Sequence, residues 1–412
     1  MTKEKVIPQI RFSGFTDTWE QRKLSAIADK VTEKNVGLQY IETFTNSAEF
    51  GIISQRDFFD HDIAKMSSLG GYYIVRSEDF VYNPRISTSA PVGPINRNKL
   101  GRIGVMSPLY TVFRPHDIDT TYLEYFFKSK YWHSFMNFNG DSGARSDRFS
   151  IKDSVFFEMP IPIPHIDEQK KIGEYLAYLD RLITLHQRKY DKLTKVKKAM
   201  LEKMFPENGS PYPEIRFKGF TDAWEQRKLG DHSEIVAGGT PNTGHPEYWN
   251  PKEIPWMSSG EINNKVIYST DNMISKIGFS NSSAKWVKEK SVLIALAGQG
   301  KTRGTVAISE IPLTTNQSIA AIQPDSFLYY KFLFQNLEER YNELREVSSG
   351  DGTRGGLNKQ IISDLEVLAP EIQEQIKIGD FLCGIDTLIT LHQRKLEKLK
   401  NIKKACLEKM FV

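Results

Sequence analysis

The chain is poor in cysteine and lacks long hydrophobic runs. Its only two cysteines, Cys383 and Cys406, lie on one predicted helix, roughly 35 Å apart along the axis. This separation excludes an intrachain disulfide and a metal site made by the two thiols alone. No apolar run reaches the about 18 residues of a membrane-spanning helix, and the N-terminal MTKEKVIPQIRF lacks the apolar core of a signal peptide. These absences predict a cytoplasmic protein in a reducing compartment.

A large excess of one charge is also missing. Lys and Arg number 55 and Asp and Glu number 51, which gives a formal net charge of +4. The positive excess lies in two lysine-rich segments, and the regions between them are close to neutral. If the protein holds nucleic acid, its basic groups must be placed locally, or a partner must supply the rest of the positive surface.

The chain does contain one long segment in two copies. Residues 164–205 and 370–411 are identical at most positions, and the heptapeptide ITLHQRK is unchanged at 183–189 and 389–395. After its first residue neither copy has a proline, and apolar residues recur every three or four positions, so each copy predicts a helix. Each helix should be about 55–60 Å long.

The apolar stripe of each copy continues over about five heptads, which favours an antiparallel coiled coil between the two copies. His186 and His392 fall on the stripe. We interpret them as packed residues with hydrogen-bond partners, with a ligand or a proton shuttle as the alternative. The lysines at 197, 198, 203, 403, 404 and 409 are assigned to the exposed face. The residues predicted to pack between the helices are Ile172, Leu176, Leu179, Ile183, His186, Leu193, Ile378, Leu382, Ile385, Ile389, His392 and Leu399.

A shorter repeat divides the chain further. PQIRFSGFTDTWEQRKL at 8–24 returns as PEIRFKGFTDAWEQRKL at 213–229, and its Trp and Phe side chains are interpreted as docking hydrophobes. The chain is therefore a short motif, a variable region and a long helix, all present twice. The predicted boundaries are 1–160 for the first domain with its motif, 161–212 for the first helix and linker, 213–366 for the second domain, and 367–412 for the second helix.

The variable regions mix strand-like segments with one helix each, at 119–138 and 325–347. We therefore expect an α+β fold, with two α/β domains joined by two long helices that pack as an antiparallel coiled coil. The scaffold segments are nearly duplicated, yet the regions between them are not. A protein that recognises an asymmetric, two-part target needs two equivalent scaffolds that carry different surfaces.

Three short motifs resemble catalytic or nucleotide-binding signatures. ALAGQGKT at 295–302 looks like a phosphate loop, but a strand-like segment follows where a helix is required. A hairpin turn or a loop that contacts nucleic acid fits it better. Glu168-Gln169-Lys170 resembles part of a nuclease motif, but the second copy has Ile376 in place of the lysine. Acidic residues in a helix's first turn need only the helix dipole to explain them.

The third motif, Tyr82-Asn83-Pro84-Arg85, resembles the tetrapeptide of amino-methyltransferases. It has one proline instead of two, and no glycine-rich cofactor loop accompanies it. No Ser/His/Asp or Cys/His arrangement stands out either. The remaining candidates are polar side chains in loops, which could equally be ordinary solvated residues.

Arg, Asn and Gln side chains read base edges, whereas Lys, Ser, Thr and backbone N–H groups favour phosphates. The candidate DNA contacts of the first region are Arg85, Ser87, Thr88, Arg97, Asn98, Arg102, Arg145 and Arg148. Those of the second region are Gly239, Thr240, Gln299, Lys301, Thr302, Arg303, Asn316, Gln317, Thr353 and Arg354.

Over its whole length the chain resembles the specificity (S) subunit of type I restriction–modification systems. The resemblance rests on the two-fold pattern, on the EQ…IG…L…D…I…L helix starts at 168–185 and 374–391, and on GGTPNTGHPEYWNPKEIPWMSS at 238–259. The last stretch is similar to the start of a target-recognition domain that is common in this family. The combination is specific, although no single motif is.

The resemblance implies a non-catalytic subunit with two target-recognition domains, each reading one half of a bipartite, asymmetric DNA site. The paired helices would set the spacer and dock two modification (methyltransferase) subunits, and restriction subunits would complete the nuclease. This chain would bind no cofactor, whereas S-adenosylmethionine, ATP and Mg²⁺ would belong to the partners. Two alternatives stay open: a stand-alone DNA methyltransferase or nuclease, and a coiled-coil adaptor that does not bind DNA.

Overall fold

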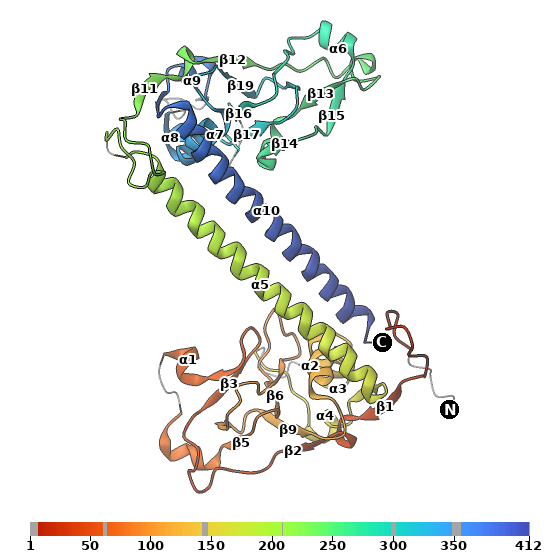
Figure 1. The fold of residues 1–412 in the computed structure, drawn as a ribbon. Helices are drawn as coiled ribbons and strands as arrows, with labels where there is room; N and C mark the ends of the chain where they lie inside the picture. Colours follow the sequence, from red (N-terminus) through yellow and green to blue (C-terminus); the bar gives the residue numbers. More distant parts are fainter. Residues whose placement is uncertain are drawn as a thin grey trace. The chain divides into compact units, whose positions relative to one another are not determined.

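The chain divides into two compact units, formed by residues 1–187 with 394–412 and by residues 188–393. Each unit holds one globular domain and a part of both long helices, α5 (Ile166–Met204) and α10 (Ile372–Lys409) (Figure 1). The end of the second helix copy therefore belongs to the first unit. The computed structural model describes residues 7–60, 64–141, 147–207, 209–297, 302–347 and 356–411.

The first domain is built around an antiparallel sheet in the order β2-β9-β6-β7. Side chains of a strand alternate between its two faces. Phe80 and Tyr82 accordingly join the core that contains α2, and Val81 joins a cluster on the other face. The sheet strands are β2 (Ala28–Lys30), β6 (Phe80–Tyr82), β7 (Ile95–Arg97) and β9 (Thr111–Pro115).

Helix α2 (Thr120–Lys128) begins after Asp119, whose carboxylate accepts a hydrogen bond from the backbone N–H of Tyr122 at 2.8 Å. Such a cap stabilises the first turn of a helix. Two further strand pairs, β3 with β4 and β5 with β8, complete this domain. Its other elements are β3 (Phe44–Ser47), β4 (Gly51–Ser54), α1 (Gln55–Phe59), β5 (Tyr73–Val75), β8 (Gly104–Met106), α3 (His133–Asn139) and α4 (Asp153–Phe156).

The second domain has a five-stranded sheet in the order β12-β19-β16-β17-β14, in which β14 runs parallel to β17. A separate three-stranded sheet has the order β15-β13-β18. The large sheet consists of β12 (Ser233–Ala237), β14 (Val266–Ile267), β16 (Ser291–Ala295), β17 (Val306–Ser309) and β19 (Ile319–Pro324). The remaining elements are β13 (Ile254–Met257), β15 (Asn272–Ile274), α6 (Lys276–Ser280), β18 (Thr314–Thr315), α7 (Tyr330–Glu339), α8 (Tyr341–Val347) and α9 (Lys359–Ser363).

The two domains share one sheet plan. The order β2-β9-β6-β7 of the first domain matches β12-β19-β16-β17 of the second, strand for strand in chain order. In each domain the strand before the helix, β9 or β19, lies inside the sheet. The expected α+β fold with two domains and long helices is confirmed, whereas the exact domain boundaries stay a prediction.

The short repeat forms a scaffold strand in each unit. Strand β1 (Glu20–Lys23) pairs with β10 (Pro160–Ile163), and β11 (Glu225–Lys228) pairs with β20 (Glu366–Ala369). The partner strand leads directly into the long helix in both cases. Trp19 and Trp224, which precede these strands, are 4% and 3% exposed. The interpretation of both indoles as docking hydrophobes is therefore confirmed.

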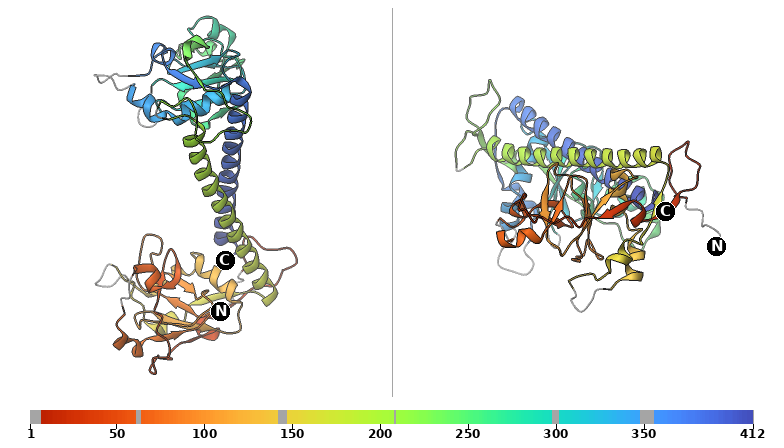
Figure 2. Two further views of the ribbon diagram at one scale, coloured as in Figure 1. Left: turned by 60° about the vertical axis from the view of Figure 1, so that its left-hand side comes forward. Right: turned by 90° about the horizontal axis from the view of Figure 1, so that it is seen from below.

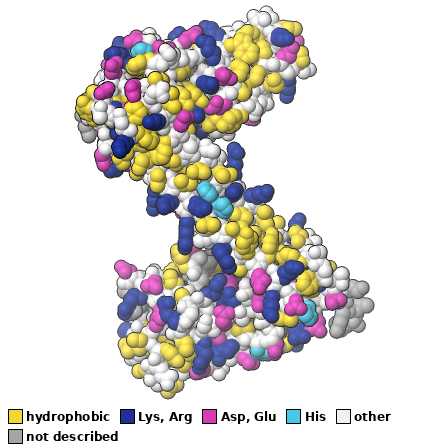
Figure 3. All heavy atoms as spheres, in the orientation of Figure 1, with side chains coloured by type: hydrophobic (Ala, Val, Ile, Leu, Met, Phe, Trp, Pro, Cys, Tyr) yellow, Lys and Arg dark blue, Asp and Glu magenta, His cyan; other side chains and the backbone are white. Residues whose placement is uncertain are grey.

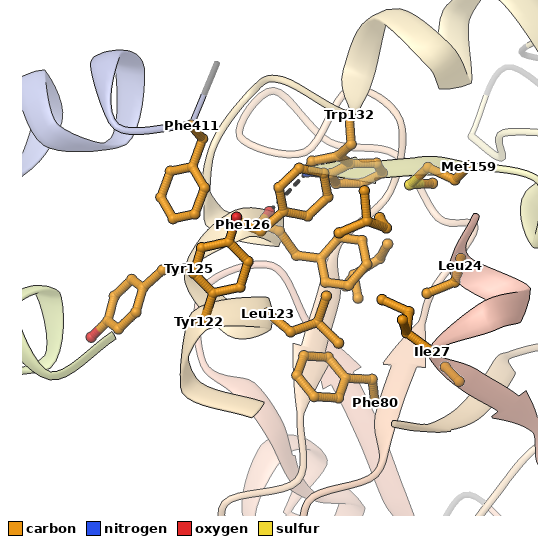
Figure 4. Close-up of a cluster of buried hydrophobic side chains, with 14 of the residues drawn as sticks. Leu24, Ile27, Phe80, Tyr122, Leu123, Tyr125, Phe126, Trp132, Met159 and Phe411 are labelled. Atoms are coloured by element: carbon orange, nitrogen blue, oxygen red, sulfur yellow. Dashed lines mark hydrogen bonds between the residues drawn. The ribbon is translucent and has the colours of Figure 1, made fainter. Parts of the chain in front are cut away.

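In the first unit the end of α10 lies beside the first half of α5, in both views of Figure 2. Ile172, Leu176 and Leu179 of α5 share a buried cluster with Cys406 and Phe411. Phe411 points toward Tyr122 and Phe126 of α2, with ring centroids 5.5 and 6.1 Å away (Figure 4). The helices run antiparallel here, because Asp180 of α5 pairs with Lys403, which precedes Cys406.

The second unit repeats this arrangement with the helices exchanged. Phe205 at the end of α5 packs 5.3 Å from Phe332 of α7, and Met204 and Phe205 share a cluster with Ile378 and Leu382 of α10. Each helix therefore begins in the core of its own domain and ends in the core of the other. This packing explains the identical LEKMF sequences at both helix ends.

The predicted helix-packing residues fall into two groups. The buried ones are Ile172, Leu176, Leu179, Ile378, Leu382 and Ile385. All of these except Ile385 belong to the clusters that form the domain cores. The residues nearer the middle of the helices are partly exposed. These are Ile183, His186, Leu193, Ile389, His392 and Leu399.

The assignment of all helix lysines to an exposed face was wrong for Lys197 and Lys403. The Lys197 side chain is 8% exposed and its ammonium lies 2.6 Å from the Asp386 carboxylate. Lys403 donates to Asp180 in the first unit. Helical periodicity could not reveal these pairs, because the carboxylates come from the other helix.

Candidate nucleic-acid interface

One edge of the first sheet gathers several predicted DNA contacts. Tyr82 at the end of β6 pairs with Ile95 and Thr111, the first residues of β7 and β9. The following loop is held by residues 147–149, because Phe149 N donates to Pro84 O at 2.7 Å. This pairing brings together Arg85, Ser87, Thr88 and Arg148, which we call the first loop edge.

Ion pairing separates Arg85 and Arg148 from other arginines of this domain. Within the described residues, neither guanidinium has a carboxylate partner. Figure 3 shows one face of the first domain, in the lower part of the picture, where Lys and Arg side chains lie among Asp and Glu side chains. Arginines without a carboxylate partner keep their donors for a ligand. The paired arginines are Arg76 with Glu33, Arg97 with Glu78 and Glu124, Arg102 with Glu42, and Arg114 with Asp79.

Arg97 and Asn98, which were predicted as DNA contacts, have buried side chains. Arg97 pairs with Phe80 across the sheet, at the end opposite Tyr82, and its side chain is 8% exposed. Its guanidinium lies 2.6 Å from the Glu124 carboxylate. Asn98 is fully buried and its amide donates to two backbone carbonyls. Both side chains hold the fold together.

Arg102 remains exposed, but both Nε and Nη2 donate to Glu42 at 2.8 and 2.7 Å. This hydrogen bond raises the pKa of Arg102. The carboxylate lies 60 residues earlier in the chain, so the local polar sequence gave no sign of it. Arg102 is therefore placed apart from the first loop edge and already has an anionic partner.

The matching edge of the second sheet gathers a different set. Ala237 ends β12, Ala295 ends β16 and Ile319 begins β19. The strand register places these three ends at one edge, because Ala237 pairs with Ala320 and Ala295 pairs with Ile319. The loops that continue from them carry Gly239, Thr240, Asn316, Gln317, Thr302 and Arg303, which we call the second loop edge.

Hydrogen bonds tie part of this edge together. Thr240 Oγ1 donates to Gln317 Oε1 at 2.5 Å, and Gly239 N donates to Thr315 O at 2.7 Å. Asn316 Oδ1 accepts from Ser318 N at 3.1 Å, so that side chain also supports its own turn. The hydrogen bond thus places Thr240 and Gln317 side by side.

Gly239 allows a close approach that no other residue would. A Cβ at this position would lie 2.3 Å from Ser283 Oγ and 2.5 Å from the Ser283 carbonyl carbon. The Gly239 carbonyl accepts a hydrogen bond from the Trp256 indole at 3.0 Å. Gly239 is therefore a positioning residue for the edge rather than a group that reaches DNA with a side chain.

Thr302 and Arg303 lie on the β16–β17 loop, next to α8. Gly304, the next residue, donates its N–H to Ala295 O at 2.9 Å and faces Arg345 and Leu344. Both predicted contacts therefore belong to the second loop edge, and both are half-buried. The predicted contacts Arg145, Gln299, Lys301, Thr353 and Arg354 lie outside the described residues.

Sequence reasoning missed the pairs that fix each domain on its helix. Arg11 donates to both oxygens of Glu168 at 2.7 Å, and Arg216 does the same to Glu374 at 2.8 Å. The glutamate side chains are fully buried, so the helix dipole alone does not account for them. The signal was available, because the arginine of the short repeat recurs at almost the same distance before the glutamate, 157 residues in the first copy and 158 in the second.

A second charged cluster joins both helices to α7. Lys197 contacts Glu338 and Asp386, and Lys265 also contacts Glu338. Burial would raise the pKa of Glu338, but Lys197 and Lys265 outweigh it and hold the pKa below its ordinary value. Asp180 in the first unit behaves in the same way. Burial would raise its pKa, but Lys403 and other donors outweigh burial and lower the pKa of Asp180.

The described residues lack two structural features. No group of three or more His, Cys, Asp or Glu side chains there could hold a metal ion. Among the same residues, no helix is both long and apolar enough to cross a bilayer.

Comparison with known proteins gives consistent results. The family profile described as "Type I restriction modification DNA specificity domain" matches residues 17–195 and 221–401. The chain is 33% identical over 190 residues to the MjaIX specificity subunit of Methanocaldococcus jannaschii, covering 43% of this chain and 41% of that protein. It is 24% identical over 263 residues to the EcoR124I/EcoR124II specificity subunit of Escherichia coli, covering 63% of each.

The chain thus spans less than two thirds of these two relatives. A crystal structure of a type I restriction–modification S subunit from M. genitalium matches with a TM-score of 0.63 at 14% identity, covering 99% of both chains. At this identity the match establishes a shared fold.

Proposed function

Because the chain belongs to the type I restriction–modification DNA specificity family, we propose that it selects the DNA sequence for a type I restriction–modification complex. The chain is non-catalytic, and each target-recognition domain reads one half of a bipartite, asymmetric site. One observation carries the proposal: the two domains share a sheet order but present different side chains on the same edge.

The chemistry of the two edges supports different half-sites. The first loop edge offers the guanidinium groups of Arg85 and Arg148, and guanidinium groups suit the two acceptors of guanine. The second offers Thr240 and Gln317, and an amide suits the donor and acceptor of adenine. Two edges with different donors and acceptors recognise different bases, which makes the combined site asymmetric.

The long helices set the spacer between the half-sites and dock two modification (methyltransferase) subunits. Support comes from α5, a continuous helix of 39 residues that belongs to both units. The modification subunits bind S-adenosylmethionine, and restriction subunits use ATP and Mg²⁺, so this chain needs no cofactor. Its small net charge of +4 agrees with partners that complete the positive surface around double-stranded DNA.

Domain exchange tests this function. Residues 230–366 are replaced by the equivalent region of another family member, and the chain is expressed with its modification subunits in cells. Methylome sequencing should then show a change in one half of the site only. The reciprocal exchange of residues 25–160 serves as the matched control and should change only the other half. A change in both halves after either exchange would contradict independent reading.

Two further outcomes would favour the alternative functions. Methyl transfer or cleavage by the purified chain alone would make it an enzyme. Absence of a two-part protected region in footprints of the assembled complex would make it an adaptor. Either result replaces the proposed function.

A further inference from the structure

The first loop edge contains a pocket, and we propose that it binds one nucleobase of the DNA half-site after that base has left the stack. The pocket has a volume of about 480 Å³, within the about 300–1,000 Å³ typical of ligand sites. The proposal rests on the proposed function, and it adds a base-binding site to it.

The location of the pocket is the first argument. Pro84, Arg148 and Phe149, which line it, are the residues that hold the first loop edge together. Leu109 and Thr111 of the neighbouring turn and strand form another side. Any duplex that contacts Arg85 and Arg148 therefore passes the mouth of the pocket.

The walls of the pocket suit a planar ring. Tyr73 and Tyr110 line it and are half-buried, whereas Tyr82 and Phe149, which also line it, are 3% and 7% exposed and belong to the hydrophobic core behind it. Tyr82 supports this wall from the core, because its ring stacks 5.0 Å from Phe156 and its hydroxyl donates to Val92 O at 3.0 Å. A base stacked on aromatic side chains gains about 1–3 kcal/mol, which offsets much of the loss of stacking in the duplex.

The polar groups of the pocket suit a base edge and its phosphate. Asp153 pairs with Lys30 and accepts a hydrogen bond from Thr111 at 3.1 Å, which places an ammonium donor beside a carboxylate acceptor. Adjacent donors and acceptors are how the edge of a base is recognised. Arg148 has no carboxylate partner among the described residues and can take the phosphate of the extruded nucleotide.

The same chemistry would accept a free nucleotide, but the position within the loop edge favours a base from DNA. A mismatch scan distinguishes the two. Ordinary read positions lose affinity on mismatch, by about 1–3 kcal/mol. A mismatch that keeps the extruded base but weakens its pairing lowers the energy of extrusion, so binding should tighten several-fold at that position.

The scan uses the full chain assembled with its modification subunits and duplexes mismatched at each position of the half-site read by the first domain. Ser150→Trp and Leu109→Trp fill the pocket from exposed lining positions. Both should abolish the tightening at one position and leave any tightening at the methylated base unchanged. Ile41→Trp is the control, since Ile41 is 67% exposed and does not line the pocket.

Three results would overturn the inference. No position tightens although the complex binds and methylates its site, in which case the proposed function survives. Alternatively, the tightening persists in both filled variants. Finally, free deoxynucleoside monophosphates bind the complex without DNA, and the filled variants lose that binding, which would assign the pocket to a free nucleotide. A complex that binds no DNA at all would instead remove the proposed function.

Discussion

The frames of the two domains repeat most of their contacts, whereas their loop edges do not. Gln169 accepts a hydrogen bond from Asp119 N at 2.9 Å, and Gln375 accepts one from Tyr329 N at the same distance. The pairs Arg11–Glu168 and Arg216–Glu374 recur in the same way. Contacts that fix a domain on its helix are thus nearly invariant within one chain.

The loop edges differ although they occupy the same place on the same sheet plan. Arg85 and Arg148 mark the first, and Thr240 and Gln317, joined by a hydrogen bond, mark the second. The comparison teaches that the loop edge can change without disturbing the frame, because the loops begin where the shared strands end. Four perturbations would break or sharpen this comparison.

Removing the arginine of the frame should have the largest effect. Arg216→Ala leaves the fully buried Glu374 carboxylate without its bidentate partner, and breaking such a pair lowers the free energy of unfolding by about 3–5 kcal/mol. Arg11→Ala should cost less, because Glu168 also accepts from the Trp19 indole at 3.1 Å. Denaturant unfolding of the full chain measures both.

The control for this pair is Arg227→Ala. Arg227 pairs with Glu225 on the surface, with side chains 49% and 59% exposed. Such pairs contribute about 0–1 kcal/mol. A loss for Arg216→Ala no greater than this would mean that the buried pair does not fix the second domain.

Acid should destabilise the second unit through Glu338. Its pKa lies below the ordinary value of 4.5, so its contribution is complete above that value and is lost as the pH falls through the folded-state pKa. Glu338→Gln should be less stable than the parent chain at neutral pH, and the difference should shrink below pH 4.5. Unfolding measured at stepped pH values shows the trend.

Glu339, the next residue, supplies a control of opposite sign. Its own burial, together with the nearby Glu207, raises the pKa of Glu339. A carboxyl with a raised pKa opposes folding at neutral pH, so Glu339→Gln should stabilise the chain there. Equal responses of the two variants would contradict the role assigned to Lys197 and Lys265.

Within the first loop edge, Arg148→Ala should weaken binding of the assembled complex to its own site by about 1–3 kcal/mol if the side chain reads a base. Arg102→Ala is the matched control, because Glu42 already occupies that guanidinium. Affinity titrations on the cognate site and on unrelated DNA measure the effect. Equal losses on both DNAs would assign Arg148 to a phosphate.

The smallest difference should separate the two frame tryptophans. Trp19→Phe removes the hydrogen bond to Glu168, whereas the Trp224 indole N–H has no hydrogen-bond partner in the described part of the chain. Trp19→Phe and Trp224→Phe leave cavities of similar size. Because only Trp19→Phe also removes a hydrogen bond, it should lower the free energy of unfolding by about 1 kcal/mol more than Trp224→Phe. Paired unfolding measurements test this, and equal losses would show that the indole bond adds nothing.

Much of the frame could be predicted from the sequence, because its signal is local or repeated. The two stripes of apolar residues gave the helices, and the repeated WEQRKL gave the docking tryptophans. Strand and helix periodicity sufficed for the α+β class. The identical helix ends were visible too, but nothing local indicated that Phe411 completes the core of the first domain.

The candidate site was predicted in part, and the errors have one physical cause. Arg97, Arg102 and Lys197 looked like free cations, yet their carboxylate partners lie far along the chain. Polar loops show where a ligand can be met, whereas long-range pairing decides which cations are left for it. Arg85 and Arg148 could be separated from the others only once the fold was known.

The packing of Met410 and Phe411 in the first unit has a consequence for synthesis. The ribosome makes the first domain early, but Met410 and Phe411, which belong to its hydrophobic core, are made only after the whole second domain. Until then Tyr122 and Phe126 of α2 lack the ring of Phe411 that packs against them. The first unit therefore reaches its final packing only after the second domain has been translated.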